Sequence, residues 1–103
     1  MATLHTVNKS PFDKNSLDSC LSVSKADSSV LFIEDGVVAA ITNTAAADKL
    51  TSAMSNGQSI YVLGADLAAR GLSEDRLLDG VKVVDYAGFV QLTVDHDRVQ
   101  NWL

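Results

Sequence analysis

Four short runs with the length of a β-strand recur along this chain, and the last three are largely apolar. They lie at residues 4–7, 30–33, 60–63 and 81–84. The second run is apolar without alternation, which is typical of a strand covered on both faces of a parallel sheet. Neighbouring runs are too far apart in the chain for hairpins, so we expect crossover connections between parallel strands.

The segment between the first two runs carries a helical pattern. Leu17, Cys20 and Leu21 are spaced so that they share one face of a helix. We expect this helix to span about residues 10–25. The residues suited to its beginning are Ser10 as a cap, Pro11 at the first helical position and Asp13 near the helix N-terminus.

Helical segments also follow the later runs. We expect a short helix or turn at 37–41, a helix that ends before Gly57, a short helix at 65–70 and a last helix at 86–94. In the last segment the apolar positions fit the helical period better than they fit strand alternation. The polar residues expected to cap these helices and turns are Thr44, Ser73 and Asp85.

Strands that alternate with helices predict an α/β fold. The chain of 103 residues is expected to form a single domain over residues 1–103. We predict a three-layer α/β/α arrangement, in which helices cover both faces of a mostly parallel sheet of about four strands.

Composition narrows the possible functions. The net charge is −5 and the eight basic residues are scattered, so direct nucleic-acid binding is not expected. No apolar stretch reaches the roughly 18 residues that span a membrane. The single cysteine cannot form an internal disulfide, and the first residues lack the pattern of a signal peptide. We therefore expect a cytoplasmic protein.

The sequence lacks the common nucleotide and redox motifs. It has neither a P-loop nor a Rossmann fingerprint, and it has no C-x-x-C pair. His96 lies between Asp95 and Asp97, but three adjacent residues cannot all face one ion. We interpret these three residues as a solvated charge cluster, and His5 as a core or interface histidine. We expect no cofactor and no metal site.

An acidic segment follows the second strand, at the edge where α/β folds bind ligands. A phospho-acceptor receiver domain has acidic residues there, but it also needs an acceptor aspartate at a later strand end. Leu63 and Gly64 occupy that position in this chain. We therefore interpret Asp35 and Gly36 as a helix entry and turn.

Cys20 is the remaining candidate for chemistry. A working thiol needs thiolate character and access, often from a helix N-terminus or a neighbouring cation. Cys20 lies well past the expected first turn, and its nearest charged neighbour in the sequence is Asp18, which would raise a thiol pKa. Free cysteines are often buried. These facts favour a structural role and leave a reactive one open.

Six segments in register resemble the DsrH/TusB family. They are LHTVNKSPF, NSLDSCL, LFIEDGVVAA, YVLGADLAARGL, VVDYAGFVQLTVDH and the terminal VQNWL. The resemblance implies a DsrE-like fold and a place as the smallest subunit of a cytoplasmic heterohexamer, with DsrE/TusD-like and DsrF/TusC-like partners. Such complexes relay persulfide sulfur from a TusA-like donor to a DsrC/TusE-like acceptor, for sulfur oxidation or for 2-thiolation of the tRNA wobble uridine.

Within this resemblance Cys20 matches the first-helix cysteine of DsrH-type members, which favours the sulfur-oxidation branch. Cys20 is then a candidate persulfide carrier, and the chain is at most a sulfurtransferase component. The principal persulfide cysteine resembles one on the DsrE/TusD-like partner, so a structural or docking subunit is the alternative. Trp102 and Leu103 are expected to pack either on a partner or on this chain's own core.

Overall fold

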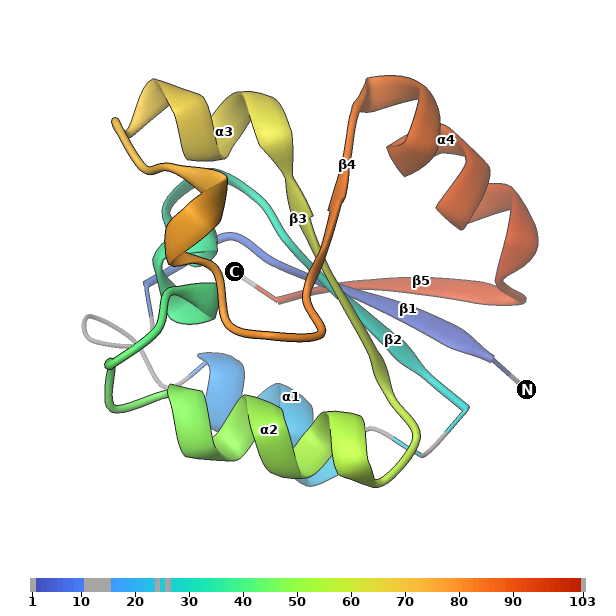
Figure 1. Ribbon diagram of the computed structural model, residues 1–103. Helices are drawn as coiled ribbons and strands as arrows, with labels where there is room; N and C mark the ends of the chain where they lie inside the picture. Colours follow the sequence, from blue (N-terminus) through green and yellow to red (C-terminus); the bar gives the residue numbers. More distant parts are fainter. Residues whose placement is uncertain (1, 11–15, 24, 26, 103) are drawn as a thin grey trace.

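The computed structural model describes residues 2–10, 16–23, 25 and 27–102 (Figure 1). Its centre is a five-stranded parallel sheet in the order β4-β3-β2-β1-β5. The strands are β1 (Thr3–Val7), β2 (Ser29–Phe32), β3 (Ser59–Leu63), β4 (Lys82–Val84) and β5 (Arg98–Trp102). The predicted parallel α/β fold is therefore confirmed.

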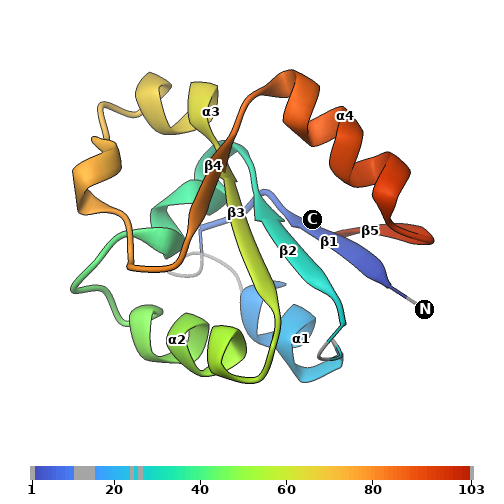
Figure 2. The same ribbon diagram turned by 45° about the vertical axis from the view of Figure 1, so that its right-hand side comes forward.

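Helices cover both faces of this sheet, as Figures 1 and 2 show. Helices α1 (Ser16–Val23) and α2 (Ala47–Ser55) lie on one face. Helix α4 (Tyr86–Asp95) crosses the opposite face on its way from the edge strand β4 to the other edge strand, β5. Helix α3 (Gly64–Ala69) packs against the 3-10 helix η1 (Glu34–Ala40), and a second 3-10 helix, η2, spans Glu74–Arg76.

The strand count is a correction, because about four strands were expected and five are present. The missed strand is β5, which pairs with β1 so that Thr3 lies opposite Arg98 and Val7 opposite Trp102. Its first four residues are exposed, as befits an edge strand. An exposed edge does not require the continuous apolar run by which the other strands were recognised.

Of the three caps predicted for the later helices and turns, two are present. The Asp85 carboxylate accepts a hydrogen bond from the Gly88 N–H of α4, at 2.7 Å, and the Ser73 hydroxyl accepts one from the Asp75 N–H of η2. The Thr44 prediction is wrong, because the N-cap of α2 is Ala46. Thr44 instead accepts the Ala47 N–H with its backbone carbonyl, which places a turn ahead of the helix.

The first helix is described only from Ser16, where α1 begins. The predicted entry at Pro11 and Asp13 lies outside the described residues. Helix α1 ends at Val23, close to the expected end. The predicted short helix or turn at 37–41 is confirmed as η1.

Two apolar cores hold the three layers together. The larger one joins α1, α2 and η1 to the sheet, and the smaller one lies under α4 around Leu4, Leu31 and Leu92. Gly36 marks the closest approach, because a Cβ at this position would lie 2.1 Å from the Val7 carbonyl oxygen. Glycine at this position lets η1 pack directly against the end of β1.

Candidate functional site

Cys20 lies in the interior of the larger core. It is 0% exposed and belongs to the same apolar cluster as Leu17 and Phe32. The one acidic residue of the described helix, Asp18, faces solvent and pairs there with Lys49 of α2 at 2.6 Å. The shared face predicted for Leu17 and Cys20 is therefore an inward face.

Burial sets the chemistry of this thiol. Desolvation raises the pKa of Cys20 from 9.0 to about 12, because the apolar surroundings disfavour the thiolate. A protonated, inaccessible thiol is a poor nucleophile. The role of Cys20 as a persulfide carrier stays a prediction, and in this chain alone it would require an opening of the core.

His5 is a core histidine, as predicted. It lies in β1 and is 4% exposed. The Trp102 indole Nε1–H, on the neighbouring strand β5, donates a hydrogen bond to His5 Nδ1 at 3.0 Å. Burial lowers the pKa of His5, because the imidazolium form would lose solvation. Trp102 is half-buried and also packs on the larger core, one of the two packing sites expected for it; Leu103 lies outside the described residues.

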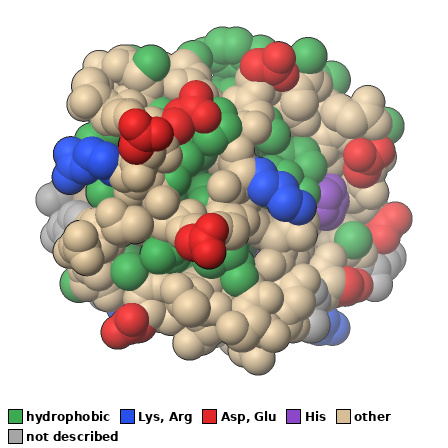
Figure 3. Space-filling view, in the orientation of Figure 1, with side chains coloured by type: hydrophobic (Ala, Val, Ile, Leu, Met, Phe, Trp, Pro, Cys, Tyr) green, Lys and Arg blue, Asp and Glu red, His purple; other side chains and the backbone are tan. Residues whose placement is uncertain are grey.

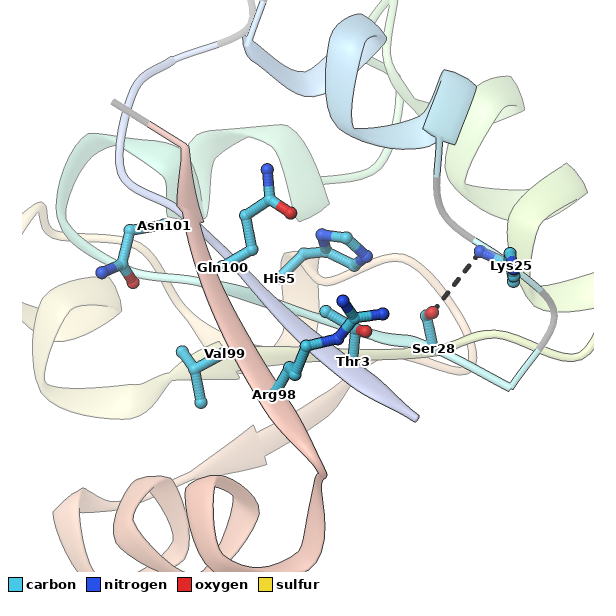
Figure 4. A pocket seen from close by; sticks show the side chains of 8 residues that line it. All are labelled: Thr3, His5, Lys25, Ser28, Arg98, Val99, Gln100 and Asn101. Atoms are coloured by element: carbon cyan, nitrogen blue, oxygen red, sulfur yellow. Dashed lines mark hydrogen bonds between the residues drawn. The ribbon is translucent and has the colours of Figure 1, made fainter. Parts of the chain in front are cut away.

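A cavity of about 600 Å³ opens beside His5, between β5 and the turn that follows α1 (Figure 4). Its polar lining comes from Thr3, His5, Lys25, Ser28, Arg98, Gln100 and Asn101. This cavity was not predicted, because it is lined by β5, the strand that was not recognised in the sequence, and by its neighbour β1.

The interpretation of His96 as part of a solvated charge cluster needs correction. The half-buried ring lies within hydrogen-bond distance of two oxygens, with Nδ1 2.7 Å from the Leu92 carbonyl and Nε2 2.9 Å from the Ser29 hydroxyl. His96 thus ties the end of α4 to β2. The Asp97 carboxylate accepts the Ala2 N–H at 3.0 Å. No group of three potential metal ligands occurs among the described residues.

The acidic segment after β2 makes local contacts, in line with the predicted helix entry. Glu34 begins η1, and its N–H donates to the Asp66 carboxylate at 2.7 Å. Asp35 pairs with Arg70, the C-cap residue of α3, at 2.9 Å. These contacts fasten η1 to α3.

The outer face of α4 is apolar and uncovered. Tyr86, Val90 and Val94 follow one another at a spacing of four residues and are 63%, 62% and 71% exposed. Figure 3 shows hydrophobic side chains gathered over the upper part of the molecule, where α3 and α4 lie. We call Tyr86, Val90 and Val94 the α4 stripe. The helix was predicted, but its pattern did not reveal that part of the apolar face points away from the sheet.

No helix in the described part of the chain combines the length and hydropathy needed to cross a membrane.

Comparison with known proteins decides the family. The sequence profile of the family described as DsrH like protein matches residues 9–99. The chain belongs to the DsrH/TusB family. Among its relatives are Protein TusB of Photorhabdus laumondii, with 40% identity over 101 residues, and Protein TusB of Pectobacterium parmentieri, with 39% over 100 residues. Each alignment covers 96% of this chain and 99% of the relative.

Solved structures support the fold assigned to this DsrH/TusB chain. The ychN protein from E. coli superposes with a TM-score of 0.83 at 19% identity, covering 98% of this chain and 99% of that one. The MTH1491 protein from Methanobacterium thermoautotrophicum gives 0.75 at 20% identity, covering 96% of each chain. At these identities the likeness concerns the fold alone.

Proposed function

We propose that this chain is a TusB-type subunit of a sulfur-relay complex, and that it serves as a structural and docking subunit rather than as the sulfur carrier. The observation that carries the proposal is the complete burial of Cys20, the only thiol, in a chain that aligns with TusB proteins over nearly its whole length. Family membership supports a place in a sulfur-relay complex. Burial of the thiol supports a structural role in which this chain does not carry the sulfur.

The relatives favour one pathway over the other. Sulfur oxidation was expected from the first-helix cysteine, but the relatives reported above carry the name TusB. We therefore propose the tRNA-thiolation branch, in which TusC-like and TusD-like chains are partners, a TusA-like protein donates sulfur and a TusE-like protein accepts it. The complex would work in the cytoplasm.

The chemistry of sulfur relay supports a structural role for this chain, with the sulfur carried by its partners. In a transfer step, an acceptor thiolate attacks the terminal sulfur of a donor persulfide, and the donor cysteine leaves as a thiolate. Cys20 lacks both thiolate character and access. Partner cysteines would therefore hold the sulfur, while this chain completes the assembly.

The α4 stripe is the surface on which we propose that a partner subunit docks. Its three side chains are each more than 60% exposed and form one continuous helical row. Exposed apolar rows of this kind are typical of subunit interfaces, and tyrosine is enriched there. Trp102, by contrast, is half-buried and packs on the larger core.

Co-expression with the TusC-like and TusD-like chains of the same organism tests the proposal. We expect Cys20→Ala to assemble and to keep the sulfur flux from donor to acceptor. Val90→Asp should fold but fail to co-purify with the partners, because it places a charge in the α4 stripe. The matched control is Thr51→Asp, which adds the same charge on the exposed side of α2. Loss of flux in an assembled Cys20→Ala complex would contradict the proposal.

A further inference from the structure

The cavity beside His5 has a location that the proposed relay function does not explain. It lies on the α1 side of the sheet, at the edge formed by β5. Figure 4 shows the side chains of His5, Arg98 and Gln100 rising from the same face of β1 and β5, while Val99 and Asn101 point to the other face. In the strand register Arg98 lies opposite Thr3, and Gln100 lies opposite His5.

The hydrogen bond from Trp102 determines which nitrogen of the His5 ring carries the proton. An indole N–H can only donate a hydrogen bond, so His5 Nδ1 must accept it and must carry no proton. A neutral imidazole in that state carries its proton on Nε2. Among the described residues Nε2 has no hydrogen-bond partner, although His5 is 96% buried and lines the cavity. The His5 ring lines the cavity, and its Nε2–H donor has no acceptor among the described residues.

The charges around this donor are positive. Arg98 and Lys25 line the cavity, and within the described part of the chain neither side chain has an ion-pair partner. The described lining residues include no Asp or Glu. This arrangement is unexpected in a chain whose net charge is −5. Arg70 and Lys49, outside the cavity, do pair with carboxylates.

Two buried hydroxyls also line the cavity. The Ser28 oxygen accepts the Lys25 backbone N–H at 3.4 Å, which leaves its own hydrogen free to donate. Thr3 supplies the second hydroxyl from β1. Together with the guanidinium, the ammonium and the imidazole N–H, these groups form a set dominated by donors. Such a set binds oxygen atoms that carry negative charge.

We propose that this cavity binds a small tetrahedral oxyanion of the phosphate or sulfate kind. Arg98 would hold two of the oxygens with its planar fork, and His5 Nε2–H would donate to a third from the floor of the cavity. Lys25 would balance part of the remaining negative charge, and the two hydroxyls would donate hydrogen bonds to the oxygens. The inference is independent of the sulfur-relay proposal, because no residue of the site belongs to the α4 stripe or contains the thiol.

The single tryptophan provides the test. Trp102 gives one indole N–H signal in a ¹H–¹⁵N spectrum, and it reports directly on His5. The full chain is titrated with inorganic phosphate and, separately, with sulfate, while chloride keeps the ionic strength constant. We expect a saturable shift of this signal with at least one of the two anions, at millimolar concentrations.

Two variants separate binding from general charge effects. Arg98→Gln removes the exposed fork and should weaken binding at least about tenfold. Arg76→Gln removes the same charge from η2, outside the cavity, and should leave the affinity unchanged. Saturation with phosphate alone assigns a phosphate ligand, and saturation with both anions assigns a general oxyanion site. A shift that saturates with neither anion, or equal affinity in Arg98→Gln and Arg76→Gln, overturns the proposal.

Discussion

The reaction of Cys20 with an aromatic disulfide reagent is expected to be at least about a thousandfold slower than that of an exposed thiol on the same helix. The perturbation is a shift of the cysteine by one position. Ser19 is the exposed neighbour of Cys20 on α1, so the double variant Ser19→Cys/Cys20→Ala carries one thiol on the outer face. The natural chain carries one thiol on the inner face.

The magnitude follows from the burial of the sulfur. At pH 8 a thiol with a pKa of 9.0 is about one-tenth ionised, whereas a pKa of about 12 leaves about one thiolate in ten thousand. The ratio is about a thousandfold, or about 4 kcal/mol. Unfolding does not remove this difference, because a domain stable by about 5 kcal/mol is unfolded only on the order of 10⁻⁴ of the time.

The assay follows release of the coloured thiolate at pH 8 in native buffer and again in concentrated urea. In urea both chains should react at the same rate, which calibrates the reagent. In native buffer only the double variant should react at a rate close to that value. A native Cys20 that reacts within about tenfold of the control, with an unchanged circular dichroism spectrum, would refute the burial argument.

Two further predictions concern the scaffold. Gly36→Ala should lower the free energy of unfolding by at least about 1–3 kcal/mol, because its Cβ would meet the Val7 carbonyl oxygen at 2.1 Å; an unchanged urea midpoint would contradict this. His5 has a folded-state pKa below its ordinary value of about 6.5, so neutral His5 stabilises the fold above that pH, and this stability is lost as the pH falls through the lowered pKa. In urea denaturation between pH 7 and 5, the free energy of unfolding should fall more steeply with decreasing pH for the natural chain than for His5→Gln. Equal pH dependence in the two chains would exclude His5 as the cause.

The sequence identified the parts of the fold that burial dictates. Residues 30–32 are all apolar because β2 is covered on both faces, so this strand could be predicted from its pattern. The caps at Ser73 and Asp85 were recognisable because their side chains bond the next turn of the same chain. The inward face of α1 followed from the spacing of Leu17 and Cys20.

The sequence could not identify features that depend on distant pairing. Strand β5 is largely exposed, and it exists because β1 offers it an edge. His96 sits among acidic residues in the sequence, yet its ring reaches Ser29, which is 67 positions away. The helical period of α4 placed its apolar residues correctly, but the sheet covers only one side of that helix. The exposed apolar side of α4 is evident only in the folded chain.

The proposal that partner subunits carry the sulfur, and this chain does not, is tested most directly by intact mass spectrometry. The assembled complex is measured after incubation with a persulfide donor. Each subunit is resolved by mass, and an added sulfur atom raises the mass of the chain that carries it. The account predicts that the TusD-like partner gains sulfur while this chain keeps its unmodified mass. Transient sulfur on Cys20 of this chain, appearing before or together with that of the partner, would contradict it.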